Sequence, residues 1–375
     1  MAYINPFKYG EAVTGECFTN RNKEIREIAE YVRAGQNIFI YSHRRLGKTS
    51  LIKTVIERLL KKKQIIPVYV DMQQVTSQAE FLEVYSREIS KGLVSLKEKI
   101  EKIASFFKRI IPSFEVDMDG NFRVSFNYSK TRECLDMALD EAFGLPGVIA
   151  NKYKKRVLVV FDEFQEIEKL NGESFEKKMR SYIQHHNKVC YIFMGSKTHL
   201  MLDMFNNPGR AFYKSAAVYP LSLMPDRDMV SFICNRFAST NKNISPELAM
   251  SVVKTCESNP YYIQMFCWNI WMAAGKRVAQ KDMDTALQEI MHNQNELFFN
   301  WYDSLSLHQR AVLKTLVQTN EIFSQDTILR HNLGSSSTVQ SSVKRLIKNG
   351  YVVKDEKEYY IADPFFRRWL SCKMF

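Results

Sequence analysis

The feature that most constrains this fold is the segment 37–50, where apolar residues lead into a short polar loop and then into Gly-Lys-Thr-Ser. This order indicates a buried strand, a tight turn and a helix. The spacing is that of the phosphate-binding loop G-x-x-x-x-G-K-[ST]. In such a loop, backbone N–H groups and the helix N-terminus surround a phosphate, and the lysine adds a positive charge. The segment therefore predicts a nucleotide site formed by Ser42, His43, Arg44, Arg45, Leu46, Gly47, Lys48, Thr49 and Ser50.

The loop departs from its motif at one position, because Ser42 stands where the first glycine is usual. Glycine permits a sharp turn there at little steric cost. Serine fits if the backbone at that position is ordinary or only mildly strained, so we expect nucleotide binding to survive. Gly47, where the backbone closely approaches the phosphate, is expected to be less replaceable.

A second string, at residues 157–163, has five apolar residues followed by two acids. A strand buried on both faces reads as a continuous apolar run, and side chains at its carboxyl end face the ligand crevice of an α/β sheet. We expect Asp162 and Thr49 to hold Mg²⁺. Glu163 is expected to orient and deprotonate the attacking water, and Lys48 to stabilise the phosphate charge. For the two acids taken alone, a solvated strand end is the alternative; the two strings together predict binding of ATP/ADP with Mg²⁺.

The chain divides into three predicted domains. Residues 1–219 are expected to form an α/β P-loop domain with a parallel sheet, interrupted at about 112–130 by a β-hairpin around Asp-Gly-Asn. Residues 220–299 read as helical and are expected to form a lid domain. Residues 300–375 read as three helices and a β-wing, which is the pattern of a winged helix.

The predicted recognition helix of this C-terminal domain, at 335–349, has basic residues and no acidic one. Lys344, Arg345 and Lys348 are candidate DNA contacts. Winged helices also serve as protein contacts and as lids in nucleotide switches, and the fold alone does not decide among these roles.

Composition excludes several classes of protein. The chain of 375 residues is 45% hydrophobic and 25% charged, as in ordinary globular proteins. No run approaches the roughly 18 apolar residues of a membrane helix, and no secretory signal precedes the first domain; we expect a cytoplasmic protein with no membrane partner. Its seven cysteines are scattered, which argues against disulfides or zinc. The net charge of +12 permits a polyanionic partner without requiring one.

Taken together, these strings resemble archaeal and bacterial P-loop ATPases that are related to the origin-recognition ATPases and to the signal-transducing (STAND) branch of the AAA+ group. The resemblance implies an AAA+-like ATPase core, a helical lid and a winged helix near the nucleotide. The strings that carry it are Asn5-Pro6-Phe7, Phe18-Thr19-Asn20-Arg21, Arg44-Arg45-Leu46-Gly47-Lys48-Thr49-Ser50-Leu51, Phe161-Asp162-Glu163-Phe164-Gln165, Asn259-Pro260-Tyr261-Tyr262 and Tyr360-Ile361-Ala362-Asp363-Pro364-Phe365-Phe366-Arg367-Arg368-Trp369.

The resemblance also suggests two contacts for the nucleotide base. Arg21 would lie beside the adenine or at the domain seam, and Pro260 would touch the base from the lid. Ser258 replaces the glycine that is usual in this family two residues before that proline, which weakens the second assignment.

Two further roles follow from the resemblance. Ser196, after the apolar strand at 189–194, would be a polar sensor of the γ-phosphate, with Lys197 as a competitor and a simple turn into a helix as the alternative. Arg210 would be an arginine finger that completes a neighbour's site in a homo-oligomer; a surface arginine is the alternative. Arg44 and Arg45 could instead cover the phosphates.

Two functions remain open at this point. The first is a Mg²⁺-dependent ATPase that acts as a nucleotide-driven conformational switch, an interpretation that Glu163 beside Asp162 favours. The second is a DNA-binding or regulatory protein that holds nucleotide with little or no hydrolysis. GTP is a weaker option because the chain has no N/T-K-x-D guanine motif. The protein partner is left open.

Overall fold

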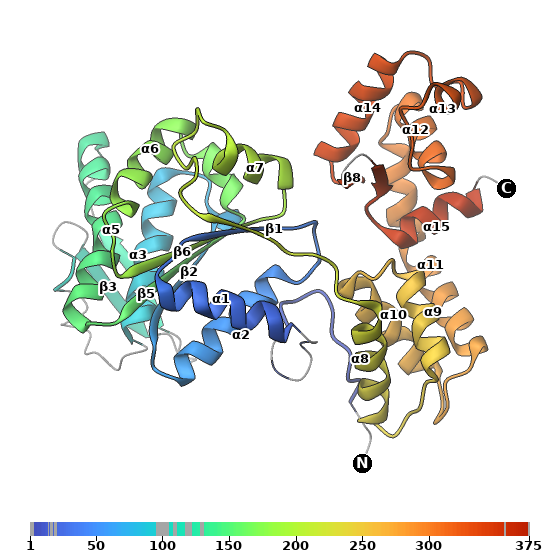
Figure 1. Cartoon of the computed structure of the whole chain (residues 1–375), viewed down its shortest axis with the longest axis horizontal. Coiled ribbons are helices and arrows are strands. Elements are labelled where there is room, and N and C mark those ends of the chain that lie inside the picture. Colours follow the sequence, from blue (N-terminus) through green and yellow to red (C-terminus); the bar gives the residue numbers. More distant parts are fainter. Residues whose placement is uncertain are drawn as a thin grey trace. The chain divides into compact units, whose positions relative to one another are not determined.

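The computed structural model describes residues 4–13, 15, 18, 21–94, 105–107, 111–116, 122–127, 131–355 and 358–373. The chain forms two compact units (Figure 1), one of them made by Arg21–Ser222. The other joins the N-terminal residues up to Asn20 to Leu223–Phe375. Each unit has its own hydrophobic core and is described separately below.

The first unit is built on a five-stranded sheet with the order β2-β5-β6-β1-β7, in which all neighbouring strands are parallel. Every residue of β6 is buried, as the continuous apolar run predicts for a strand covered on both faces. The strands are β1 (Ile38–Tyr41), β2 (Ile65–Asp71), β5 (Arg156–Asp162), β6 (Val189–Gly195) and β7 (Ala217–Pro220).

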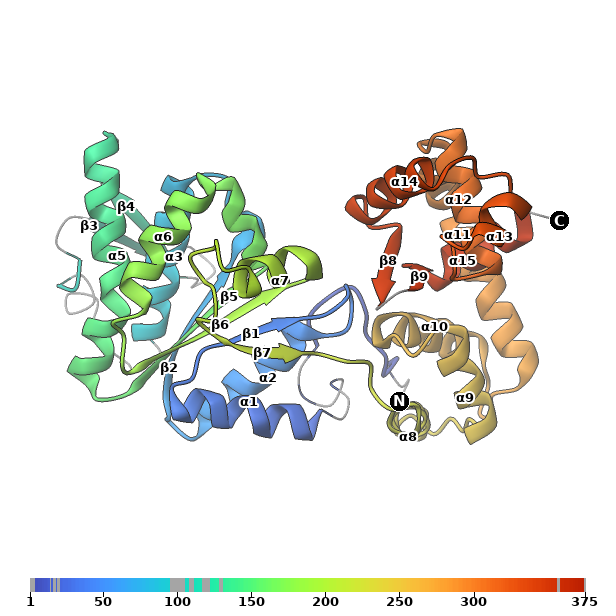
Figure 2. The same ribbon diagram turned by 45° about the horizontal axis from the view of Figure 1, so that its top comes forward.

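Helices cover both faces of this sheet. Figure 2 shows α1 and α2 on one face, and α3, α5, α6 and α7 on the other. The helices are α1 (Asn22–Ala34), α2 (Lys48–Lys61), α3 (Gln78–Val94), α5 (Arg132–Tyr153), α6 (Gly172–Ile183) and α7 (Thr198–Asn206), with short 3₁₀ helices η2 (Met72–Gln74) and η3 (Phe164–Lys169). The resulting three layers confirm the predicted α/β P-loop fold.

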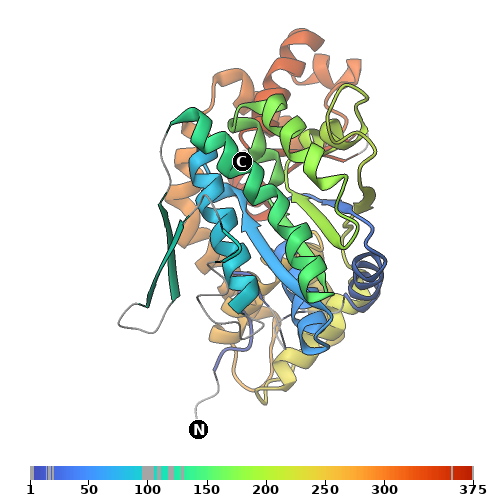
Figure 3. The ribbon, with the colours of Figure 1, turned by 90° about the vertical axis from the view of Figure 1, so that its left-hand side faces the viewer.

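A separate two-stranded antiparallel sheet lies beside α3 (Figure 3). It consists of β3 (Ile111–Val116) and β4 (Phe122–Asn127), which are paired from Ile111 with Asn127 to Val116 with Phe122. The predicted hairpin is therefore confirmed, and its predicted Asp-Gly-Asn turn lies outside the described residues.

The second unit begins with four helices: α8 (Asp226–Ala238), α9 (Pro246–Thr255), α10 (Pro260–Ala273) and α11 (Gln280–Asp303). The N-terminal segment packs into their core. Phe7 is completely buried, with its ring 5.0 Å from that of Phe237, and the Asn5 amide donates to the carbonyl of Trp268. The sequence-based boundary grouped these first residues with the nucleotide domain, whereas the structure places them with the helices.

The winged helix completes this unit and confirms the prediction for the C-terminal domain. Serine side chains at 306, 324 and 335 cap its helices, as expected for hydroxyls that satisfy free backbone N–H groups. Aromatic residues of α15, Phe366 and Trp369, pack on Phe298 of α11, so the helical part and the winged helix share one core. The elements are α12 (Leu307–Gln318), α13 (Gln325–Arg330), α14 (Ser336–Lys348), β8 (Val352–Asp355), β9 (Glu358–Ile361) and α15 (Pro364–Lys373).

Candidate functional site

The loop between β1 and α2 has the backbone that its sequence predicts. Gly47 is left-handed with φ 84°, and helix α2 begins at Lys48. Arg45 is also left-handed, with φ 68°, whereas Ser42 is not among the residues with positive φ. The position where the motif usually has its first glycine therefore does not need glycine's conformational freedom in this chain.

Lys48 lies buried inside this loop, with only 6% of its surface exposed. Its ammonium group donates to the Ser42 carbonyl at 3.3 Å and to the Ser42 hydroxyl at 3.2 Å. Burial lowers the pKa of Lys48, while the carboxylates of Glu163 and Asp162 partly oppose that effect. Ser42 therefore holds the lysine at the point where α2 begins.

Asp162 ends β5 beside this loop, and three donors fix its carboxylate. Its Oδ2 accepts from the Thr49 hydroxyl at 2.7 Å and from the Tyr69 hydroxyl at 2.5 Å. Its Oδ1 accepts from the backbone N–H of Glu163 at 3.0 Å. Burial raises the pKa of Asp162, although the bonds from Tyr69 and Thr49 act in the opposite direction. The structure thus brings together the two predicted magnesium ligands and adds Tyr69, which the sequence analysis missed.

Glu163 follows in a left-handed conformation, with φ 49°. Its Oε2 accepts from the Ser196 hydroxyl at 2.7 Å, from the Ser196 backbone N–H at 3.2 Å and from the Gln165 amide at 2.6 Å. The predicted catalytic base, Glu163, and the predicted sensor, Ser196, therefore meet directly. Lys197, the competing sensor candidate, instead pairs with Glu166 at 2.8 Å.

Gln165 is another residue of the site whose role the sequence did not reveal, although it belongs to the string that follows β5. It is 3% exposed, and its Oε1 has no hydrogen-bond partner among the described residues. That oxygen lies against Gly195, where an added Cβ would meet it at 2.4 Å. Glycine at this strand end therefore leaves room for the glutamine beside Glu163.

Arg21, the residue before α1, reaches the phosphate loop although it lies outside the sequence motif of that loop. It is 4% exposed, donates to Glu24 at 2.7 Å and lies 3.5 Å from the Leu46 carbonyl through its second Nη. These contacts bring Arg21 to the loop, and its expected place beside the adenine or at the domain seam stays a prediction.

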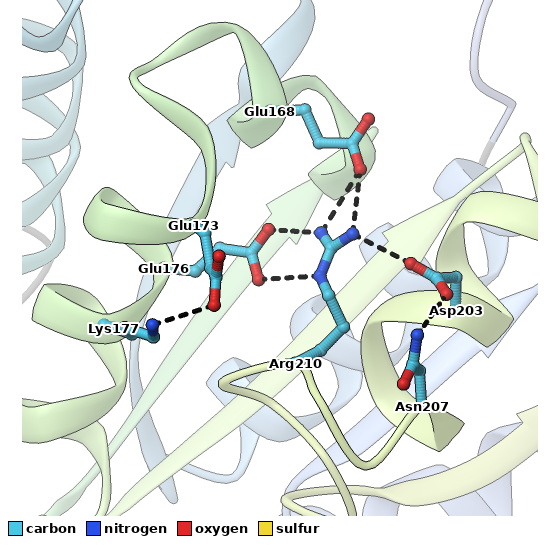
Figure 4. A network of polar contacts seen from close by, with 7 residues as sticks. All are labelled: Glu168, Glu173, Glu176, Lys177, Asp203, Asn207 and Arg210. Atoms are coloured by element: carbon cyan, nitrogen blue, oxygen red, sulfur yellow. Dashed lines mark hydrogen bonds and ion pairs between the residues drawn. The ribbon is translucent and has the colours of Figure 1, made fainter.

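Arg210 is not brought to these residues. Its guanidinium instead bonds three carboxylates of its own unit (Figure 4): Glu176 on α6, Glu168 on η3 and Asp203 on α7. The Glu176 side chain is completely buried, and 19% of the Arg210 side chain is exposed. Among the described residues, the guanidinium has no bond to the phosphate loop or to the ends of β5 and β6.

Pro260 belongs to the other unit, where it is the first residue of α10. Ser258, two residues earlier, is left-handed with φ 55° and donates to Asp226 at 2.7 Å. The serine therefore adopts the conformation that the family's glycine would take easily.

The basic residues predicted to contact DNA lie on the outer face of α14. Lys344, Arg345 and Lys348 are exposed, and none of them forms an ion pair within the part of the chain that the structure describes. The opposite face of α14 is buried, where Ser342 bonds His308 at 2.7 Å.

Within the described ranges, no helix has the length and apolar character needed to cross a membrane. The same ranges contain no cluster of three or more histidine, cysteine or acidic side chains suited to a metal ion. The fold and site together define a class: an α/β P-loop ATPase with a C-terminal winged helix.

Comparison with known proteins identifies the family within this class. Residues 18–266 match a family described as "ATPase domain predominantly from Archaea", and residues 296–372 match one described as "Probable winged helix domain". The chain belongs to this predominantly archaeal family of ATPases.

Its curated relatives include two uncharacterized ATP-binding proteins of Methanocaldococcus jannaschii. One is 26% identical over 163 residues, which cover 42% of this chain and 41% of the relative. Another is 24% identical over 198 residues, which cover 51% of this chain and 48% of the relative. The chain thus matches about half the length of these relatives or less.

Solved structures with a similar fold include a Walker-type ATPase of Pyrococcus abyssi. It has a TM-score of 0.68 at 18% identity, and the match covers 98% of this chain and 99% of that one. The ORC2 protein of Aeropyrum pernix, in ADPNP and ADP complexes, has a TM-score of 0.55 at 13% identity, with 94% of each chain covered. These likenesses confirm the expected relation to origin-recognition ATPases at the level of the fold.

Proposed function

We propose that this protein is a Mg²⁺-dependent ATPase that acts as a nucleotide-driven conformational switch. The observation that carries the proposal is the set of bonds around Glu163, whose carboxylate is oriented next to Asp162 and the phosphate loop. A protein that only held nucleotide would need the loop and Asp162, but it would not need an oriented base beside them.

The phosphates would lie at the N-terminus of α2, where free backbone N–H groups and the helix dipole favour an anion. Lys48 has its ammonium group within the loop, and an entering phosphate offers it a stronger acceptor than the neutral Ser42 oxygens. Arg44 and Arg45 lie in the same loop and add positive charge around this position.

Thr49 and Asp162 fit a magnesium ion, because Mg²⁺ prefers oxygen ligands and is commonly held by one or two protein groups together with substrate phosphates. Their oxygens lie 2.7 Å apart at the start of α2. When bound, the ion would neutralise phosphate charge during transfer.

Glu163 is suited to act as a general base on water. Within the part of the chain that the structure describes, the side-chain hydrogen bonds of Glu163 all fall on Oε2, which leaves Oε1 to accept a proton from water. Ser196 and Gln165 hold the carboxylate in one orientation, which matters because a base must lie within hydrogen-bond reach of the proton that it removes.

Phosphate release by wild type and Glu163→Gln tests hydrolysis, with Glu173→Gln as a matched control. Glu173 is an exposed glutamate of α6 that pairs with Lys177, and among the described residues it has no bond to the site. We expect hydrolysis to fall by about 10²-fold or more in Glu163→Gln, the range of general-base catalysis, with ATP still bound. Equal turnover in wild type and Glu163→Gln would refute the role of Glu163 as the base.

A second candidate function, DNA binding with little or no hydrolysis, is favoured by the exposed basic face of α14. The test compares wild type with a variant in which Lys344, Arg345 and Lys348 are changed to glutamine. Retention of duplex DNA by both proteins is measured as the salt concentration is raised. The exposed lysines at 61, 62 and 63 provide a control triple substitution of the same charge. DNA retention that both triple variants lower equally would contradict a role for α14.

A further inference from the structure

Tyr69 lies at the metal side of the proposed site although no motif includes it. Strand β2 pairs in parallel with β5, so that Tyr69 stands opposite Val160 and Asp71 stands opposite Asp162. The Tyr69 hydroxyl donates to Asp162 Oδ2 at 2.5 Å, and its ring lies 5.7 Å from the ammonium group of Lys53 on α2. The side chain therefore lies between the end of β5 and the first turns of the phosphate-loop helix.

We propose that Tyr69 is a positioning residue for the magnesium ion: it holds the Asp162 carboxylate in the orientation that the ion and Thr49 require. The inference rests on the proposed function, because it assigns a role within the same nucleotide site. Tyr69 acts through Asp162 and touches neither the phosphate nor the reacting water.

The distribution of bonds on Asp162 carries the argument. Thr49 and Tyr69 both donate to Oδ2, while the Glu163 N–H donates to Oδ1. Two donors on one oxygen and one on the other fix both the position and the plane of the carboxylate. A threonine hydroxyl that binds Mg²⁺ through a lone pair can keep its proton on Asp162, so this arrangement also suits the loaded site.

Tyr69→Phe removes only the hydroxyl and keeps the ring on β2. Without this donor, Asp162 keeps Thr49 but loses the bond that restrains it from the β2 side. Loss of such an outer contact commonly weakens metal binding by about 10–100-fold. We therefore expect the Mg²⁺ concentration that supports half-maximal ADPNP binding to rise about tenfold.

The test measures binding of the non-hydrolysable analogue ADPNP to the full chain, during a Mg²⁺ titration and separately in EDTA. For Tyr69→Phe we expect the Mg²⁺ midpoint to rise about tenfold, with ADPNP affinity in EDTA equal to that of wild type. Tyr219→Phe is the matched control. Tyr219 lies on the edge strand β7, and its hydroxyl also donates to a carboxylate, that of Glu27, over 2.7 Å.

An unchanged Mg²⁺ midpoint in Tyr69→Phe would overturn the inference. An equal loss of affinity with Mg²⁺ and in EDTA would also overturn it, because that result describes general damage to the sheet. The proposed function fails in a different way, namely when wild type itself binds ADPNP with no dependence on Mg²⁺.

Discussion

Replacing Arg210 with methionine tests whether this arginine acts within its own domain or in a neighbour's site. Methionine keeps much of the side-chain volume and removes the positive charge. In the structure, Arg210 is the counter-charge of Glu176, which is completely buried on α6. The substitution therefore leaves a carboxylate in the interior without an ionic partner.

The magnitude follows from the three ion pairs of Arg210. Breaking a buried pair by removing one partner costs about 3–5 kcal/mol. The partners Glu168 and Asp203 are 37% and 41% exposed, so each of those pairs adds at most about 1 kcal/mol. Because 19% of Arg210 is exposed, we expect the lower end, about 3 kcal/mol. In a domain of this size that corresponds to about 6–12 °C in the unfolding midpoint.

The loss should also depend on pH. Burial raises the pKa of Glu176 even though the bond from Arg210 lowers it in part. An acid whose pKa is raised in the folded state stabilises the fold fully below its unfolded pKa, and that stability is lost as pH rises through the folded pKa. Removing Arg210 raises the pKa of Glu176 further, so the deficit relative to wild type should be larger at pH 8 than at pH 5.

Thermal unfolding at both pH values provides the assay, with Lys178→Met as the control. Lys178 is also on α6 and pairs with two carboxylates, those of Asp136 and Asp140, which are 58% and 44% exposed. Its loss should cost about 1 kcal/mol or less.

The reasoning is refuted if Arg210→Met unfolds like wild type at pH 8. The alternative role, a finger that acts in a neighbour's site, would then predict restored ATP hydrolysis on mixing Arg210→Met with Glu163→Gln. In such a mixed assembly, one subunit would supply the arginine and the other the base.

Two further predictions concern the loop and a half-buried histidine. Gly47→Ala places a side chain at φ 84°, which costs about 1–3 kcal/mol, so ADPNP affinity should fall by about 5- to 150-fold. Ser42→Gly should leave the affinity within about threefold, and calorimetric titration measures both. Burial lowers the pKa of His186 to about 4, so the fold favours the neutral ring, and stability should decline as pH falls from about 6.5 towards 4. Substituting His186→Gln should remove that part of the decline, as measured by unfolding curves recorded at a series of acidic pH values. An unchanged dependence of stability on pH would contradict the lowered pKa of His186.

The sequence predicted those parts of the site that are encoded in contiguous strings. The Gly-Lys-Thr string and the acids after an apolar run imply their own backbone context, because each string includes the strand or helix that presents it. Asp162 and Thr49 accordingly meet where the motifs predict that they should. The same holds for Ser196, which follows a strand whose apolar run ends at the same edge.

Contacts across the sheet were not predictable in this way. Tyr69 reaches Asp162 because β2 pairs with β5 in one particular register, and no local pattern gives that register. Gln165 was visible within a motif, but its role depends on the bare Cα of Gly195 on another strand. Arg210 illustrates the converse, because its position after a strand suggested a finger and its ionic partners come from three separate elements.

Phe7 has a consequence for how the molecule is assembled and divided. Its ring is enclosed by helices that are synthesised more than half a chain later. During synthesis Phe7 therefore has no core to pack into until those helices have emerged from the ribosome. Cutting the chain ahead of Leu223 would not release an intact C-terminal fragment, because truncating a buried phenylalanine alone costs about 3–5 kcal/mol. A peptide covering residues 4–13, supplied separately, should restore the missing stability of such a fragment by binding in trans.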